Sequence, residues 1–185
     1  MIYLIDHEDS FTYNLMHLLE NFDDVYVSNY FDINKKKLEE SSLVVFSPGP
    51  GEPKNYPTSN RLYKELKGKK KILGICLGFQ LILHNEKGKI VQQKNIYHGF
   101  QSKIKVLKKS KIFNENKYFI VGRYHSLRLN EPFFSKEIDI TMRCVHSKVA
   151  MGIEDINNKV FGFQFHPDSF LTIDGKKIIQ KIISI

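Results

Sequence analysis

Short apolar runs alternate with segments of helical periodicity in the first half of the chain. Uninterrupted apolar runs at 2–5, 43–46 and 72–75 have the pattern of strands buried on both faces of a sheet. A shorter run at 25–27 predicts a further strand. Helices are expected between these runs, at 11–22 behind a cap supplied by Asp9 or Ser10, and then at 35–40, 61–66 and 77–83. Strands that alternate with helices in this way predict a parallel sheet covered by helices on both sides.

The second half of the chain has a different pattern. Few helical segments occur between residues 90 and 165, and the apolar positions fall in short β-like runs, among them 103–107, 118–121, 138–142 and 160–165. These runs predict antiparallel additions to the sheet, and an amphipathic helix at 175–183 closes the chain. The expected fold class is therefore α/β, a doubly wound and mainly parallel sheet with antiparallel strands added. A length of 185 residues, without a repeat or linker, fits one domain over 1–185.

The composition is that of a folded globular domain, with 42% hydrophobic and 26% charged residues. The net charge of +8 permits a nucleic-acid partner, but the lysines are scattered and no basic motif with interleaved aromatic residues occurs, so no nucleic-acid role is expected. No apolar run is long enough to span a membrane, and the first residues are too short an apolar stretch for a signal peptide. Two cysteines without a Cys-x-x-Cys pair argue against a disulfide framework or a cysteine zinc site. These features favour a cytoplasmic protein without a membrane partner.

A candidate nucleophile lies where the apolar run at 72–75 gives way to a helix. Cys76 belongs to Gly74-Ile75-Cys76-Leu77-Gly78, a Gly-x-Cys-x-Gly sequence that is the cysteine form of a nucleophile elbow. The glycines allow the close packing that a sharp strand-to-helix turn requires, and the N-terminus of the following helix stabilises a thiolate. A buried structural cysteine is the alternative interpretation, which the elbow disfavours.

One of the seven histidines is placed to activate Cys76. His166 follows the apolar run at 160–165, at the edge where open α/β sheets form their active crevice and where Cys76 is also expected. Asp168, two residues later behind a proline, can accept a hydrogen bond from the imidazole and fix its tautomer. His125 is a weaker candidate for the same base. The sequence therefore predicts a catalytic triad of cysteine, histidine and aspartate, and a surface turn at the His-Pro-Asp sequence is the plainer alternative.

Acyl transfer by a cysteine also needs hydrogen-bond donors for a developing oxyanion. The N–H of Leu77, directly after the nucleophile, is one candidate. The loop Ser47-Pro48-Gly49-Pro50-Gly51 leaves the end of another predicted strand, and its two glycines let backbone N–H groups approach a substrate. A phosphate-binding loop is the rival interpretation, but the Gly-Lys-Ser/Thr ending of such loops is absent.

Six motifs in this order make the chain resemble the class I, or triad, glutamine amidotransferases, and within them the small glutaminase subunits of the chorismate-aminating synthases. The motifs extend over nearly the whole chain: Asp9-Ser10-Phe11-Thr12-Tyr13-Asn14-Leu15, the loop at 47–51, the elbow extended to Phe79-Gln80, His98-Gly99, Arg123-Tyr124-His125-Ser126-Leu127, and the segment 162–169 around His166. The resemblance implies a flavodoxin-like α/β domain with glutaminase activity.

The resemblance also implies a role for each matching residue. Cys76 attacks the side-chain amide of L-glutamine to give a γ-glutamyl thioester and ammonia, with His166 as base and then acid, oriented by Asp168. The substrate-binding residues are Gly49, Pro50, Gly51 and Leu77 around the reacting amide and its oxyanion, and Gln80, Ser126 and Leu127 around the α-amino and carboxylate groups. The ammonia passes to a larger chorismate-binding synthase subunit, which makes anthranilate or aminodeoxychorismate. No metal and no cofactor is implied for the glutaminase half.

The chain departs from the family pattern at three places. Asp168 stands where the family normally has Glu, His7-Glu8 stands where Asn-Tyr is usual, and Phe100 replaces the usual Lys after His98-Gly99. The shorter carboxylate leaves open a catalytically impaired, amidotransferase-like binding or regulatory module, and a stand-alone γ-glutamyl thiol hydrolase is a third hypothesis. Plain interpretations are expected for the remaining candidates: His7, His17, His84 and His146 show no metal-site spacing, and Cys144 is expected to be a spectator thiol.

Overall fold

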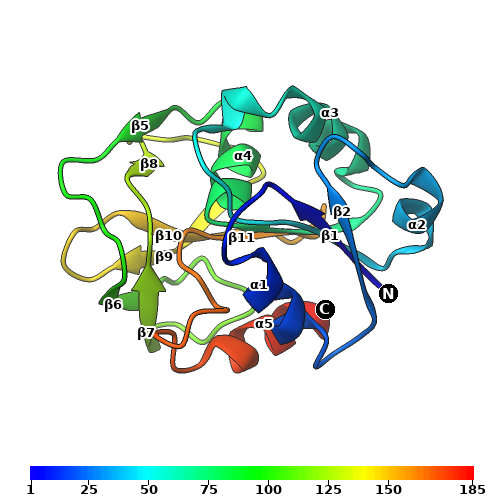
Figure 1. Ribbon diagram of the computed structural model, residues 1–185. Helices are drawn as coiled ribbons and strands as arrows, with labels where there is room; N and C mark the ends of the chain where they lie inside the picture. The colour runs from blue at the N-terminus through cyan, green and yellow to red at the C-terminus, as the bar shows by residue number, and fades with distance from the viewer.

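A sheet of nine strands runs through the molecule in the computed structural model, which describes residues 1–185 (Figure 1). Its first part is parallel and consists of β2 (Val25–Asn29), β1 (Ile2–Asp6), β3 (Leu43–Phe46), β4 (Lys71–Ile75) and β11 (Val160–Phe163), which are neighbours in that order. The residues of β3, β4 and β11 are almost all fully buried, as expected for strands covered on both faces. The predicted doubly wound sheet is confirmed.

The sheet continues with four antiparallel strands from the second half of the chain. Beyond β11 the order is β10 (Ala150–Asp155), β9 (Asp139–Cys144), β6 (Phe100–Val106) and β7 (Tyr118–Arg123). Two further strands of three residues each, β5 (Ile90–Gln92) and β8 (Leu127–Leu129), form a separate antiparallel pair. The antiparallel additions were expected, whereas β5, β8 and β10 had no counterpart among the runs picked out from the sequence.

Strand β11 belongs to both halves of the sheet. It pairs in parallel with β4 on one side and antiparallel with β10 on the other. The run at 160–165 was expected to be one of the antiparallel additions, and its pairing with β4 corrects that expectation. The parallel pairing matters for the site because it brings the carboxyl ends of β4 and β11 to the same edge of the sheet.

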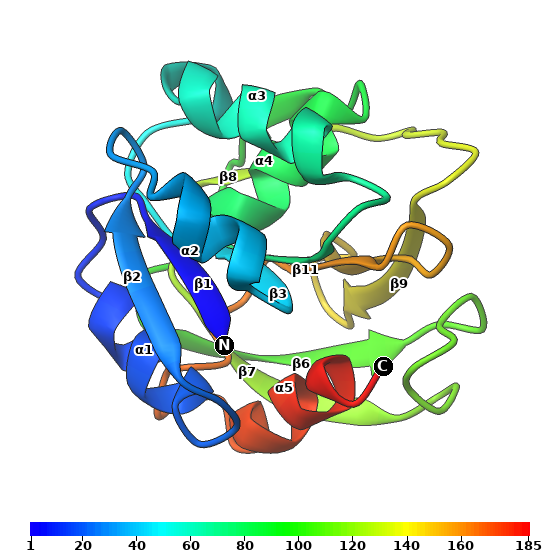
Figure 2. The ribbon, with the colours of Figure 1, turned by 90° about the vertical axis from the view of Figure 1, so that its right-hand side faces the viewer.

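Helices cover both faces of the sheet (Figures 1 and 2). On one face lie α1 (Thr12–Leu19) and α5 (Gly175–Ile183), and on the other lie α2 (Lys35–Glu40), α3 (Pro57–Leu66), α4 (Leu77–Asn85) and the short η1 (Pro53–Asn55). Each layer has its own apolar core, with Leu15 and Ile178 in one and Leu62 and Leu81 in the other. None of the helices is both long and apolar enough to cross a bilayer.

The start of α1 differs from the expected capping. Phe11 holds the N-cap position and makes no side-chain cap, so neither Asp9 nor Ser10 caps the helix in the expected sense. The Asp9 carboxylate instead accepts from the Phe11 N–H at 2.8 Å, one residue before the helix. The hydroxyl of Thr12 donates to Asp6 at the end of β1, at 2.7 Å. These bonds form a tight turn between β1 and α1, which the spacing of polar residues alone could not distinguish from a cap.

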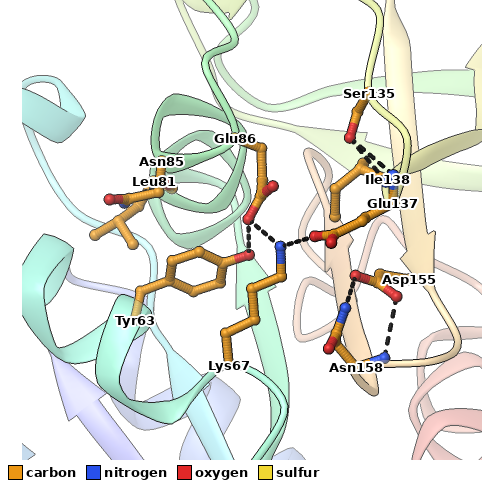
Figure 3. A network of polar contacts seen from close by, with 10 residues as sticks. All are labelled: Tyr63, Lys67, Leu81, Asn85, Glu86, Ser135, Glu137, Ile138, Asp155 and Asn158. Atoms are coloured by element: carbon orange, nitrogen blue, oxygen red, sulfur yellow. Dashed lines mark hydrogen bonds and ion pairs between the residues drawn. The ribbon is translucent and has the colours of Figure 1, made fainter.

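A polar network connects the C-terminal ends of α3 and α4 with the segment before β9 (Figure 3). The ammonium of Lys67 contacts both Glu86 and Glu137, and the Tyr63 hydroxyl donates to Glu86 at 2.7 Å. Lys67 and Glu86 are mostly buried, and Lys67 is the charge partner that Glu86 needs there, while Lys67 itself is paired with both glutamates. The network holds α3, α4 and the segment at 130–138 together, away from the strand ends that carry the predicted site.

Candidate active site

The carboxyl ends of four neighbouring strands meet at one edge of the sheet. The strands β1, β3, β4 and β11 are followed in that order by His7, Ser47, Cys76 and Gln164. Strand β7 reaches the same edge through an isolated bridge between Gly122 and His166, in which the His166 N–H donates to the Gly122 carbonyl at 3.1 Å. Residues far apart in the sequence are thereby collected where open α/β sheets bind their ligands.

Cys76 has the strained backbone of a nucleophile elbow. Its φ is +53°, in the region that non-glycine residues rarely adopt, and its N–H donates to the Phe163 carbonyl of β11 at 2.8 Å. A Cβ on Gly74 would lie 2.5 Å from the backbone of Gly78, and one on Gly78 would lie 2.2 Å from the Phe46 carbonyl. The predicted reason for both glycines is confirmed, because only glycine permits this approach of β4, α4 and β3.

His166 and Asp168 lie next to each other beside the elbow, with both side chains buried. His166 Nδ1 lies 3.7 Å from Asp168 Oδ1, which is longer than a hydrogen bond, and both side chains are almost fully buried. Neither ring nitrogen and neither carboxylate oxygen has a hydrogen-bond partner. Phe11 and Tyr124 pack edge-on against the imidazole, with ring centroids 4.9 and 5.0 Å away. Unsatisfied ionisable groups that face one another in a buried site are typical of functional sites.

The charge state of His166 depends on its two neighbours. Burial by itself lowers the pKa of His166, but the Asp168 carboxylate and the Cys76 sulfur raise it by more, so the pKa ends above its usual value. An imidazolium is therefore favoured beside the Cys76 sulfur. This is the charge arrangement that a cysteine nucleophile with a histidine partner requires.

A row of amides links the elbow to the segment at 126–127. Gln164 Nε2 lies 3.8 Å from Cys76 Sγ, and Gln164 Oε1 accepts from Gln80 Nε2 at 3.1 Å. Gln80 Nε2 also approaches the Leu127 carbonyl at 3.4 Å. The half-buried Ser126 accepts at its carbonyl from the N–H of Gln93 at 2.8 Å. The structure thus brings the predicted substrate-binding residues Gln80 and Leu127 into one network with Cys76.

His125 is committed to structural bonds and is not free to act as a base. Arg123 Nε donates to His125 Nε2 at 3.0 Å, and His125 Nδ1 lies 2.8 Å from the Leu127 carbonyl. Because Nε2 accepts a hydrogen bond, the ring proton is on Nδ1, which donates a hydrogen bond to the Leu127 carbonyl. Burial and the adjacent guanidinium lower the pKa of His125 to about 3. His125 therefore fixes the backbone of Leu127, which excludes the weaker candidate for the base.

The loop at 47–51 contributes to the site unequally along its length. A Cβ on Gly49 would lie 2.5 Å from the Leu77 side chain and 2.6 Å from the Cβ of His7, so Gly49 is wedged beside the elbow. Pro50 is exposed and its carbonyl accepts from the Tyr56 hydroxyl at 2.8 Å. Gly51, with φ +73°, is exposed and faces Asn55. Of the three predicted loop residues, Gly49 is the one in direct contact with another site residue.

Gln164 and His7 also belong to this edge, although neither was among the predicted site residues. Gln164 stands within the motif around His166, in an otherwise apolar run, and an amide in such a run is the signal that could have singled it out. His7 directly follows an apolar strand, as Ser47 and Cys76 do, but was noted only as a departure from the family pattern and as a histidine without metal-site spacing. No three His, Cys, Asp or Glu side chains converge in a way that could hold a metal ion. A surface cavity of about 660 Å³ lies at the opposite end of the sheet, between α5 and the segment at 111–119.

The chain matches the family model "Glutamine amidotransferase class-I" over residues 3–185. It belongs to this family. It is 36% identical to anthranilate synthase component 2 of Lactococcus lactis over 186 residues, covering 100% of this chain and 94% of that protein. It is 32% identical to anthranilate synthase component 2 of Helicobacter pylori, covering 98% of this chain and 95% of that protein. The matched family is the one that the sequence motifs resemble, and its members are enzymes.

A solved structure supports the fold of this amidotransferase. The crystal structure of a putative GMP synthase component from Thermoplasma acidophilum superposes with a TM-score of 0.84, covering 99% of this chain and 92% of that one. The sequence identity is 20%, so the likeness extends to the fold alone. The mainly parallel sheet with antiparallel additions is therefore the family's architecture, carried here by a distant sequence.

We expect the buried histidines of this amidotransferase to make it less stable in mild acid. Burial lowers the pKa of His7 to about 4. Between pH 6.5 and 4, His7 is therefore protonated in the unfolded chain but stays neutral in the folded chain. Folded stability is then lost as the pH falls from about 6.5 to 4, by about 2 to 3 kcal/mol from His7. His166 shifts in the other direction and adds no loss in this window. Urea unfolding at pH 7.0 and 4.5 measures the difference.

A pair of variants isolates the contribution of His7 to this pH dependence. His7→Asn is expected to reduce the loss of stability between the two pH values, whereas His17→Asn, at an exposed histidine, is expected to leave it unchanged. An unchanged loss in His7→Asn would contradict the assignment of His7 as a buried neutral imidazole.

Proposed function

We propose that the chain is a glutaminase subunit that supplies ammonia to a larger, chorismate-aminating synthase subunit. The observation that carries the proposal is the elbow geometry of Cys76 beside the buried His166, with both residues at the ends of adjacent parallel strands. The relatives named anthranilate synthase component 2 support chorismate as the acceptor on the partner's side. No metal or cofactor takes part in the glutaminase step.

Cys76 attacks the carboxamide carbon of L-glutamine. The sulfur forms a bond to that carbon, and the tetrahedral intermediate is stabilised by backbone N–H groups of Leu77 and Gly49. The imidazolium of His166 then gives its proton to the departing nitrogen, so ammonia leaves and a γ-glutamyl thioester remains. His166, now neutral, takes a proton from water, whose oxygen attacks the thioester and releases glutamate and the thiolate.

The remaining residues position the substrate and the base. Asp168 orients His166 and stabilises its protonated form. Gln80, Ser126 and Leu127 hold the α-amino and carboxylate groups of glutamine, and Pro50 and Gly51 form the outer part of the loop at 47–51. Phe11 and Tyr124 pack against the imidazole of His166 and limit the access of water to this ring.

Ammonia release and covalent trapping test the proposal. Purified full-length protein, tested by itself and with a chorismate-aminating synthase subunit, is expected to release ammonia from L-glutamine, faster in the complex. A glutamine-analogue electrophile is expected to label Cys76 selectively, with glutamine protecting it, and mass spectrometry of peptides locates the label. Absence of both ammonia and selective labelling would favour an impaired binding module. Full activity on γ-glutamyl peptides that no synthase subunit stimulates would favour a stand-alone thiol hydrolase.

Lengthening the third triad residue is expected to increase activity. The 3.7 Å gap between Asp168 and His166 exceeds a hydrogen bond, and one added methylene brings the carboxylate within reach of Nδ1. Asp168→Glu is therefore expected to raise kcat by about 2- to 10-fold, the value of one added hydrogen bond. Steady-state glutaminase assays measure the change. Asp168→Asn, which removes the charge at nearly constant volume, is the matched variant, and it is expected to lower kcat; equal rates in all three proteins would remove residue 168 from the mechanism.

A further inference from the structure

His7 occupies the position after β1 and is completely buried behind the loop at 47–51. Its backbone N–H donates to Ser47 Oγ at 2.9 Å, and its ring Nδ1 lies 3.1 Å from the same oxygen. On the far side of the ring, Nε2 lies 2.9 Å from Ser59 Oγ of α3. The imidazole thus joins three elements: the end of β1, the loop after β3, and α3.

The hydrogen bonds around Ser47 determine the tautomer of His7. The Ser47 hydroxyl has one proton, which it donates to the Pro48 carbonyl at 2.6 Å. Ser47 Oγ can therefore only accept from His7, so Nδ1 carries the ring proton and Nε2 accepts from the Ser59 hydroxyl. The low pKa of the buried ring keeps it neutral at pH 7, in agreement with one proton on the ring.

This imidazole supports the loop at the point where the loop meets the elbow. Gly49 fits between Leu77 and His7, with no room for a Cβ against either residue. The Tyr56 hydroxyl holds the next carbonyl, that of Pro50. The ring of Tyr56 packs edge-on against His7, with centroids 5.0 Å apart. The loop is therefore fixed on both sides of Gly49, through Ser47 before it and Pro50 after it.

We propose that His7 is a positioning residue for the oxyanion site. Its Nδ1–H bond to Ser47 fixes the backbone from Ser47 to Gly49, so that the N–H groups of Gly49 and Leu77 converge on the oxygen of the tetrahedral intermediate. The inference rests on the proposed glutaminase function and deepens it. Precise placement of such donors matters because they act on the transition state far more than on the bound substrate.

Two substitutions separate the two ring nitrogens of His7. The side-chain amide nitrogen of Asn reaches the place of Nδ1, whereas the longer Gln places its amide near Nε2. His7→Asn therefore keeps the donor to Ser47 and loses the contact with Ser59, and His7→Gln does the reverse. Asn is also the residue that the family pattern usually has at this position, so the first variant tests whether the two residue types provide the same donor.

The expected result is a loss of turnover in one variant and not in the other. In glutaminase assays of the full-length protein, His7→Gln is expected to lower kcat by about 10- to 100-fold, with KM for glutamine changed less than about threefold. His7→Asn and Ser59→Ala are expected to stay within about threefold of the wild-type kcat. A role confined to stability would instead lower the unfolding midpoint of all three and leave kcat of the folded protein unchanged.

Two outcomes would overturn the proposal: a folded His7→Gln protein with wild-type kcat, or equal losses of kcat in the Gln and Asn variants. If His7→Gln does not fold, Ser47→Ala removes the same acceptor and is expected to show the same fall in kcat. Nitrogen-15 NMR of the wild-type imidazole gives a readout independent of activity, and a proton on Nε2 instead of Nδ1 at pH 7 would also overturn the inference. A wild-type protein that is inactive but has the expected tautomer would count against the proposed function, while the hydrogen bond from His7 to Ser47 would still hold.

Discussion

Replacing Cys76 by serine is expected to reduce ammonia release from glutamine by about 10³- to 10⁵-fold. The reason is that serine at this elbow keeps the shape of the site but is not ionised next to His166, so the attacking group is lost. The affinity for glutamine is expected to change little, because Gln80, Ser126 and Leu127, which hold its α-amino and carboxylate groups in the proposed function, are unchanged. Initial rates of ammonia production at saturating glutamine, with glutamine binding measured separately by calorimetry, would show both effects.

The second cysteine of the chain provides the control for this prediction. Cys144 is buried at the end of β9, where its sulfur lies 3.6 Å from Arg123 Nη1, and it is not among the predicted site residues. Cys144→Ser is expected to keep glutaminase activity within about threefold of the wild type. Full turnover in Cys76→Ser, or a comparable loss in Cys144→Ser, would assign the chemistry to a different group.

Replacing Gly78 by alanine is expected to reduce both stability and activity. At an ordinary helix position this change stabilises a protein by up to about 1 kcal/mol, because alanine is the better helix former. Here the new Cβ would lie 2.2 Å from the Phe46 carbonyl and 2.8 Å from the Phe46 Cβ, and neither can move without moving β3. We expect a loss of about 2 to 4 kcal/mol in the free energy of unfolding, measured in urea. Activity is expected to fall in the folded fraction as well, because a displaced α4 carries the Leu77 N–H away from the oxyanion.

His84→Ala on the same helix is the matched control for Gly78→Ala. His84 is exposed near the end of α4, so its replacement is expected to change stability by less than about 0.5 kcal/mol. If Gly78→Ala were as stable as His84→Ala, the close packing of α4 on β3 would not be a requirement of the elbow.

The parts of the fold that were predictable are those in which one segment sets its own structure. The apolar stripe over 175–183 predicted α5 with its bounds, and the buried run of β1 was equally clear. Pairing partners were not predictable, because the sequence of β11 is equally compatible with a parallel and an antiparallel neighbour. Strand β10 was missed because it contains two buried acidic residues, Glu154 and Asp155, and so lacks the apolar pattern of a buried strand. The Glu154 carboxylate can be buried because it accepts hydrogen bonds from the Ser110 hydroxyl and the Lys111 N–H.

The site was predictable where a short motif records its own geometry. The glycines around Cys76 and the strand before His166 placed both residues at one edge, and the structure brings them there. The role of His7 was not visible, because it depends on two serines that lie about 40 and 50 residues away in the sequence. The commitment of His125 to Arg123 and Leu127 likewise required three dimensions, although the three residues lie within one motif.

The central position of β11 in the sheet affects the order in which the enzyme can fold. This strand is synthesised after every other strand of the sheet, yet it must be inserted between β4 and β10, and its pairing with β4 joins segments about 90 residues apart. A nascent or truncated chain that ends before residue 160 lacks both the middle strand of the sheet and His166, the base of the proposed mechanism. The proposed reaction of Cys76 therefore becomes possible only after β11 has paired with both of its neighbours, so a partly made chain does not yet contain the complete proposed site.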